Sequence, residues 1–189
     1  DGQRIEGTVG FPLPGVNIRT NKKDNILPPN EKGIVQVKGP NVFRGYWGMQ
    51  KKTEEEFKED GFFITGDIGQ IDEEGRLTLS GRVSDMIISG GYNIYPKEIE
   101  IILNSINNIK ESAVIGVKDL DLGESAVAIL TLENKELKIS DKNILDILEN
   151  RIARYKITKS FVWVEDLPIN AMGKVQKKDL RIKYEKILL

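Results

Sequence analysis

Three charged residues stand next to glycines, in segments that could present a side chain to a small molecule. Asp67 lies in "ITGDIG", Arg82 ends "LTLSGR", and Lys174 follows the glycine of "AMGKV". A carboxylate offers only acceptors and suits a pair of sugar hydroxyls, whereas a guanidinium fork and an ammonium suit anionic oxygens. These residue types favour the binding and charge stabilisation of a polar, anionic ligand.

Each of these positions also has an ordinary explanation. Gly-Asp is common in turns, an arginine at a strand end often makes a surface ion pair, and exposed lysines are frequent. The diglycine of "SGGYN" is typical of a plain turn, although Gly90 and Gly91 would also let a linear ligand pass close to the backbone. Neither a dinucleotide fingerprint nor a phosphate-loop motif is present at these sites.

Composition narrows the chemistry that the chain can perform. Its 189 residues include no cysteine and no histidine, which excludes thiolate nucleophiles, Cys/His zinc sites and histidine bases. No metal site is predicted. Lys+Arg 28 against Asp+Glu 29 leaves a net charge of −1, which argues against nucleic acid as a partner. No apolar run approaches the ~20 residues of a membrane helix, so no membrane span is expected. A cytoplasmic location is expected, with which the lack of cysteine is compatible.

The first part of the chain is patterned mostly for β structure. The expected strands are residues 8–20, 32–39, 61–72 and 76–82. The last two form a hairpin that carries Asp67 and Arg82. Thr53, with Glu56 three residues later, matches a capping box, which predicts a helix that begins at Thr53.

The second part alternates between strand and helix patterns. The expected strands are residues 111–119, 125–133 and 159–166, and the expected helices are 95–103, 140–152 and 177–189. Pro96 suits a first helical turn and Ser140 an N-cap. The fold class expected is therefore α+β or α/β: a β-rich part, residues 1–83, followed by a small α/β domain, residues 84–189.

Five segments carry a resemblance to a known family. They are "GTVGFPLPG", "GPNVFRGYW", "DGFFITGDIG", "SGRVSDMIISGGYNIYPKEIE" and "NAMGKVQKKDL". In order and spacing, over essentially the whole chain, they resemble the acyl-adenylate-forming acyl-CoA synthetases, and in detail the malonyl-CoA synthetases. The resemblance implies that residues 1–83 are the last subdomain of the large N-terminal domain. Residues 84–189 would be the small, mobile C-terminal domain.

The resemblance also implies a role for each candidate residue. Asp67 would accept hydrogen bonds from the ribose hydroxyls of ATP, Arg82 would contact the ribose or a phosphate, and Lys174 would be the catalytic lysine. The path of CoA would be lined by Ser89, Gly90, Gly91 and Tyr92. Ser84 takes the hinge position, where the family commonly has Asp or Lys.

The substrates and partners follow from the same resemblance. An acid-thiol ligase of this kind, with a place in fatty acid metabolism, joins a small carboxylate, here malonate, to CoA at the expense of ATP with Mg²⁺. The alternatives are another small acid, an aryl acid or a fatty acid as substrate, or a non-catalytic binding module. The phosphate loop, the Mg²⁺ site and most of the acyl pocket would lie upstream of Asp1. The chain is therefore expected to be part of a longer enzyme and inactive alone.

Overall fold

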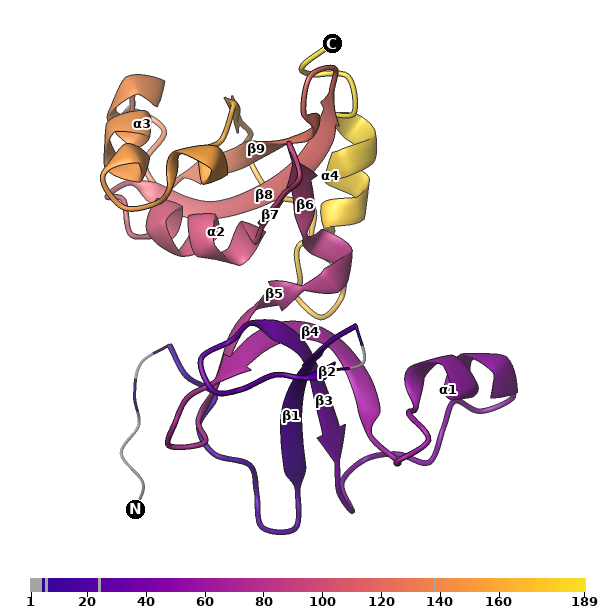
Figure 1. Cartoon of the computed structure of the whole chain (residues 1–189). Helices are drawn as coiled ribbons and strands as arrows, with labels where there is room; N and C mark the ends of the chain where they lie inside the picture. Colours follow the sequence, from indigo (N-terminus) through magenta and orange to yellow (C-terminus); the bar gives the residue numbers. More distant parts are fainter. Residues whose placement is uncertain (1–4, 6, 24, 138) are drawn as a thin grey trace. The chain divides into compact units, whose positions relative to one another are not determined.

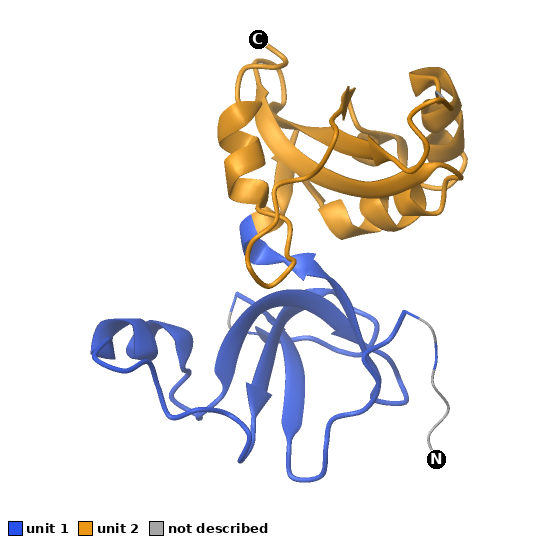
Figure 2. Ribbon diagram, turned by 180° about the vertical axis from the view of Figure 1, so that it is seen from behind, with its two compact units in different colours: residues 1–84 blue, residues 85–189 orange. Residues whose placement is uncertain are grey.

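The chain divides into two units, Asp1–Ser84 and Asp85–Leu189, which Figure 2 colours separately. The computed structural model describes residues 5, 7–23, 25–137 and 139–189, and Figure 1 follows the chain through them. Within these residues each unit contains one five-stranded sheet. The β-rich part followed by an α+β part agrees with the fold class expected from the sequence.

The first unit is an antiparallel sheet in the order β2-β1-β3-β4-β5. Its elements are β1 (Asn17–Lys22), β2 (Asn25–Ile26), β3 (Gly33–Lys38), α1 (Gln50–Glu56), β4 (Phe63–Ile71) and β5 (Leu77–Arg82). β-branched and other large apolar residues favour these strands, and Val35, Ile68 and Leu77 are buried in the core of the unit. The predicted β4–β5 hairpin is present.

A close approach of two strands fixes the pairing of this hairpin. A Cβ atom built on Gly69 of β4 would lie 2.5 Å from the carbonyl oxygen of Thr78 in β5, so only glycine fits there. The pairing shifts by a β-bulge between Ile68 and Gly69, and beyond the bulge Asp67 stands opposite Arg82. The second glycine of "ITGDIG" is therefore required by packing.

The capping box predicted at Thr53 is wrong. Helix α1 begins at Gln50, with Met49 at the N-cap, so Thr53 lies inside the helix. Its hydroxyl accepts a hydrogen bond from the Tyr46 N–H at 2.9 Å and donates one to the Met49 carbonyl at 3.1 Å. Both partners of the hydroxyl are backbone groups that precede Thr53. The chain already turns before Thr53, where the Met49 N–H donates to the Tyr46 carbonyl.

The second unit packs helices against both faces of its sheet. Its strands are β6 (Ile87–Ser89), β7 (Tyr92–Ile94), β8 (Ile109–Asp119), β9 (Gly123–Leu132) and β10 (Ser160–Trp163), and its helices are α2 (Pro96–Asn104), α3 (Asp141–Glu149) and α4 (Lys177–Lys183). β8 and β9 form a long antiparallel hairpin, and β10 joins β9 in parallel. Most neighbouring strands of this sheet are therefore antiparallel, which makes the unit α+β rather than α/β.

Strand alternation divides the apolar residues of β8 and β9 between two cores. Val114, Ala128 and Leu130 face α2 and α3, whose Ile99, Leu103, Ile144 and Leu148 are fully buried with them. Ala113, Ile115, Val127 and Ile129 face the other side, where Leu180 of α4 packs. Figure 1 shows α2 and α3 apart from α4 on the two sides of this hairpin. Both faces are covered, so both carry apolar residues.

The helices of the second unit begin within one residue of the predicted positions, but α3 ends at Glu149 rather than at residue 152. Pro96 occupies the first turn of α2, and the Ser140 hydroxyl accepts the Asn143 N–H as the predicted N-cap of α3. Helix α4, however, ends at Lys183 rather than at residue 189. Tyr184 leaves helical geometry, and its ring packs against the second core.

A buried aspartate organises the turn between β8 and β9. Asp119 accepts hydrogen bonds from the Ser125 hydroxyl and the Lys159 ammonium, each at 2.5 Å. Its other oxygen accepts the backbone N–H groups of Asp121 and Leu122. The Lys159 ammonium, followed by the Ser125 hydroxyl, holds the pKa of the Asp119 carboxyl well below its ordinary value.

We predict that Asp119 contributes to the acid sensitivity of the chain. Because its pKa is lowered in the folded state, its stabilisation is complete above the unfolded value of about 3.9 and is lost as the pH falls below it. Asp119→Asn should therefore lower the free energy of unfolding at pH 7 and reduce its fall between pH 7 and pH 3, measured by urea titration. The exposed Asp166→Asn variant is the control. Equal falls for wild type and Asp119→Asn would contradict the prediction.

Candidate functional site

Asp67 and Arg82 are paired across β4 and β5. They are direct cross-strand partners, and Arg82 Nε lies 3.2 Å from Asp67 Oδ1. Gly66, with a φ of +74°, turns the chain just before Asp67, which glycine does without strain. Backbone pairing, rather than the ion pair itself, therefore holds the two charged groups together.

This pair leaves room for a ligand. The Asp67 side chain is 26% exposed and the Arg82 side chain 60% exposed. A carboxylate has about four acceptor positions, so the contact with Arg82 occupies only part of it. An exposed pair of this kind contributes at most about 1 kcal/mol to stability, so a ligand can share it at little cost.

The "SGGYN" segment forms the tight turn between β6 and β7. Ser89 and Tyr92 are strand partners, and Gly90 and Gly91 have φ values of +55° and +83°. Two central residues with positive φ define a type I′ hairpin turn, which explains both glycines by backbone geometry alone. The Gly90 N–H donates to the Leu122 carbonyl at 2.9 Å, and a Cβ on Gly91 would meet nothing within 4 Å.

An aromatic pair stands beside this turn and was not predicted from the sequence. The exposed rings of Tyr92 and Tyr155 are 4.9 Å apart at an interplanar angle of 30°. Tyr155 belongs to the 3₁₀ turn η2 (Arg154–Lys156), which is tied to α2 by a 2.5 Å contact between Lys156 Nζ and Glu98 Oε2. Burial disfavours the Lys156 charge, but the hydrogen bond to Glu98 and the negative charges around Lys156, chiefly that of Glu98, together outweigh it, and the pKa of Lys156 is raised.

Ser84, the predicted hinge residue, is the last residue of the first unit. It lies in the 3₁₀ turn η1 (Val83–Asp85). Asp85, the first residue of the second unit, accepts a hydrogen bond from Arg181 of α4 at 3.1 Å. The chain therefore enters the second unit at an ionically fixed residue, and the hinge role of Ser84 stays a prediction.

Lys174 lies beside the turn of a small hairpin that precedes α4. The Gln176 N–H donates to the Pro168 carbonyl at 2.8 Å, and Ile169 and Val175 form an antiparallel bridge. The lysine is exposed, and its ammonium has no hydrogen bond or ion pair with any residue that the structure describes. A cation presented in this way is available to an anionic ligand.

A buried ion pair fixes the start of α4, which directly follows this hairpin, to the rest of the unit. Lys177 Nζ lies 2.6 Å from Glu100 Oε1, with side-chain exposures of 17% and 8%. The same oxygen accepts the Val114 N–H at 2.9 Å. β8 pairs only with β9 among the described strands, so Glu100 satisfies a backbone donor at the free edge of the sheet. One carboxylate thereby joins α2, β8 and α4.

The structure brings together some of the residues that the sequence singled out. Asp67 and Arg82 are in contact within the first unit, whereas Lys174 and the 89–92 turn lie on separate hairpins of the second. Sequence reasoning did not single out Glu100. The second glutamate of "EIE", three residues before the buried Leu103, gives no sign that it will be buried.

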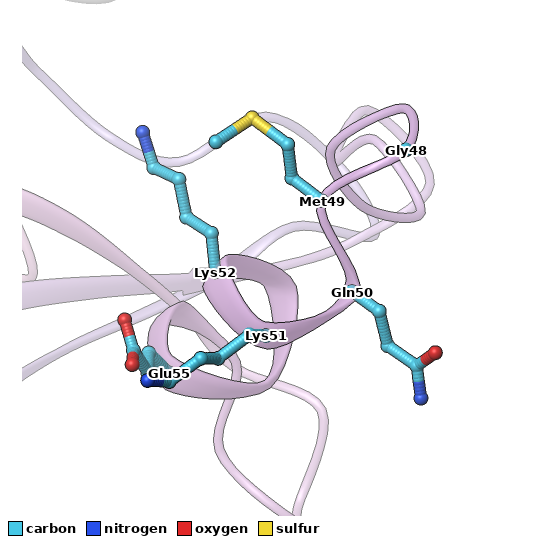
Figure 3. A pocket seen from close by; sticks show the side chains of 6 residues that line it. All are labelled: Gly48, Met49, Gln50, Lys51, Lys52 and Glu55. Atoms are coloured by element: carbon cyan, nitrogen blue, oxygen red, sulfur yellow. The ribbon is translucent and has the colours of Figure 1, made fainter.

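An open pocket lies at the start of α1 and contains none of the candidate residues. It has a volume of about 490 Å³ and is lined by Gly48, Met49, Gln50, Lys51, Lys52 and Glu55. Figure 3 shows Gln50 and Lys52 pointing away from each other. The Lys52 ammonium instead lies 4.4 Å from the centre of the Tyr46 ring. We assign this pocket no function.

The part of the chain that the structure describes contains neither a cluster of metal-ligating side chains nor a helix that could span a membrane. No cluster of three or more acidic, histidine or cysteine side chains could hold a metal ion there, so no Mg²⁺ ligand is assigned to these residues. None of the helices has the length and apolarity needed to cross a bilayer.

Known proteins with similar sequences show which enzymes the chain resembles. Residues 98–174 match the model of the AMP-binding enzyme C-terminal domain. The chain is 43% identical to an indoleacetate–CoA ligase of Aromatoleum aromaticum and 39% identical to a malonate–CoA ligase of Arabidopsis thaliana. The first alignment covers 96% of this chain and 35% of the relative, the second 97% and 32%.

A solved structure agrees over the entire chain. ATP-bound MatB from Rhodopseudomonas palustris superposes with a TM-score of 0.94 at 46% identity and covers 100% of this chain and 38% of the MatB chain. The chain is similar over nearly its whole length to acyl-CoA ligases. It spans about a third of the length of the ligases that it matches, and its second unit contains the region that matches the C-terminal domain of AMP-binding enzymes.

We predict that Lys177 stabilises the second unit more than its neighbour Lys178 does. Lys177→Met leaves the Glu100 carboxylate buried without a cation, which should cost about 3 kcal/mol in the free energy of unfolding. Lys178→Met, at an exposed position, should cost less than about 0.5 kcal/mol. Urea titration of the chain measures both.

The double variant Glu100→Gln/Lys177→Met tests the cause. It removes the uncompensated charge and keeps an acceptor for the Val114 N–H, so it should recover part of the loss. Equal effects of Lys177→Met and Lys178→Met would contradict an anchoring role for the ion pair.

Proposed function

We propose that this chain is part of an ATP-dependent acyl-CoA ligase that converts a carboxylate, ATP and CoA into acyl-CoA, AMP and diphosphate through an acyl-adenylate. The observation that carries the proposal is the exposed ammonium of Lys174, which has no partner among the residues that the structure describes. It stands on a structurally fixed hairpin, within a chain whose relatives are CoA ligases. Because the chain spans about a third of those relatives, we propose that the phosphate loop, Mg²⁺ site and acyl pocket lie elsewhere in a longer protein.

Asp67 and Arg82 are proposed to bind the nucleotide. The Asp67 carboxylate would accept hydrogen bonds from both ribose hydroxyls, and Arg82 would contact the ribose or an adjacent phosphate. Their cross-strand pairing supports this role, because it presents an acceptor and a donor side by side, 3.2 Å apart and partly exposed. A ribose diol needs acceptors, and an anionic phosphate needs donors.

Lys174 is proposed to act in the first half-reaction. A carboxylate oxygen attacks the α-phosphorus of ATP while the bond to the bridging oxygen breaks and diphosphate leaves. Two anions approach each other and negative charge grows on the phosphoryl oxygens, which a single ammonium can neutralise. In the second half-reaction the sulfur of CoA attacks the acyl carbonyl and AMP leaves, so this charge is no longer forming.

The second unit is proposed to move between the two half-reactions. Residues 1–83 would belong to the large domain and residues 84–189 to the small mobile domain, with Ser84 at the hinge. Ser89, Gly90, Gly91 and Tyr92 would then line the path of CoA. The open space above Gly91 supports this role, because a linear molecule could lie against the backbone there. A cytoplasmic location stays a prediction from the sequence.

Malonate is the proposed substrate. The malonate–CoA ligase relative and the sequence resemblance to malonyl-CoA synthetases favour it. An aryl acid is the second candidate, because the indoleacetate–CoA ligase is slightly more similar over nearly the same stretch. Fatty acids are the remaining alternative within the class.

We predict that Lys174→Ala in the full-length enzyme slows adenylation by about 10²–10³-fold, the cost of losing one preorganised charge-stabilising group. Thioester formation from preformed acyl-adenylate and CoA should stay close to the wild-type rate. Single-turnover kinetics of each half-reaction measure the two effects separately. The exposed neighbour Lys178→Ala serves as control. If both half-reactions slow equally, the proposed step-specific role of Lys174 is wrong.

We also predict that the full-length enzyme catalyses ATP–diphosphate exchange more efficiently with malonate than with indoleacetate or a long-chain fatty acid. A difference of at least tenfold in kcat/KM is expected, because a pocket that pairs a second carboxylate leaves its cation unpaired when an apolar acid binds. Preference for indoleacetate would move the assignment to the aryl acids. No exchange with any carboxylate would favour the non-catalytic binding module.

A further inference from the structure

The side chain of Asn170 holds the turn from which Lys174 projects. Asn170 Oδ1 accepts two backbone hydrogen bonds, from the N–H groups of Met172 and Lys174, each at 2.9 Å. One amide oxygen thus bonds to the backbone of the lysine itself. Asn170 is half-buried, whereas residues 171–174 are exposed.

The backbone of the same turn is closed by a second pair of bonds. The Asn170 N–H donates to the Lys174 carbonyl, and the Gly173 N–H donates to the Asn170 carbonyl, each at 2.9 Å. Gly173 has a φ of +75°. A four-residue turn whose last residue is a glycine in the left-handed region is the arrangement of a type I turn with a bulge, in which Asn is favoured at the first position.

Packing contributes little at this tip, so hydrogen bonds carry its geometry. Met172 is 75% exposed, and Ala171 and Gly173 are exposed as well. The Lys174 ammonium stands at the end of a flexible four-carbon stem. The volume that it can reach is therefore set by the position and direction of its Cα, which the bond from its own N–H to Asn170 restrains.

We propose that Asn170 is a positioning residue for Lys174. It fixes the Lys174 backbone before substrate arrives, so less conformational freedom is lost when the ammonium meets the developing charge. The neutral amide supplies the acceptor without placing a negative charge beside the cation, as an aspartate would. This inference rests on the proposed role of Lys174 in adenylation.

Amide hydrogen exchange tests the structural part on the 189-residue chain. In Asn170→Ala the N–H groups of Met172 and Lys174 should exchange about fivefold faster or more, the equivalent of one lost hydrogen bond. Asn170→Ser keeps a neutral oxygen and should restore part of the protection. Asn150→Ala, which removes a side-chain bond to the Asp146 carbonyl elsewhere, should leave both groups unchanged. Unchanged exchange in Asn170→Ala would overturn the proposal.

Kinetics of the full-length enzyme test the functional part. Asn170→Ala should lower kcat for adenylation about tenfold, since small displacements of a reacting group are costly, while KM for ATP stays within about twofold. Thioester formation should not change, and Asn170→Ser should recover part of the loss. Equal slowing of both half-reactions would point to general unfolding and overturn the positioning role.

Lys174→Ala in the same assay separates the two proposals. If Lys174→Ala slows adenylation and Asn170→Ala does not, the positioning role is wrong and the proposed function stands. If Lys174→Ala has no effect, the proposed role of Lys174 fails, and Asn170 loses its kinetic role with it. The exchange measurement still decides whether Asn170 holds the turn.

Discussion

The arrangement of the second unit depends on the buried carboxylate of Glu100, which needs a cation and a hydrogen-bond donor. Water is largely excluded from it, so its charge is tolerable only because Lys177 and the Val114 N–H both bond to it. The first of these partners lies on α4 and the second on the free edge of β8. Meeting this requirement therefore fixes where α4 begins, and with it one end of the hairpin that presents Lys174.

The two units hold their charged groups in different ways. In the first, Asp67 and Arg82 are placed by the pairing of β4 and β5, which Gly69 permits by bringing the strands close. In the second, Lys174 is exposed and belongs to no strand or helix, so local turn bonds and the start of α4 place it. A sheet gives a fixed pair, whereas a short hairpin presents a single exposed charge.

The sequence predicted features that depend on neighbouring residues. It did not predict features that depend on contacts between residues far apart in the chain. Ser140 was predicted to be an N-cap and is one in the structure, because a cap depends on its immediate neighbours. Thr53 matched the same kind of signal, yet an earlier turn started the helix before it. Asn170 could have been found, since "NAMG" has the residues of a type I turn with a bulge. The Glu100–Lys177 pair could not, because it joins residues far apart in the chain that no local pattern relates.

The continuous apolar stretch of β9, residues 126–130, faces two cores at once. A sheet with one wet face resists slippage, because a shift by one residue would expose its apolar side chains, but here either alignment would keep them covered. Burial therefore gives little protection against a misaligned β8–β9 hairpin during folding. That protection must come from polar contacts that exist in one alignment only. The Asp119 carboxylate, which has to meet the Ser125 hydroxyl and the Lys159 ammonium together, supplies it at the closed end of the hairpin.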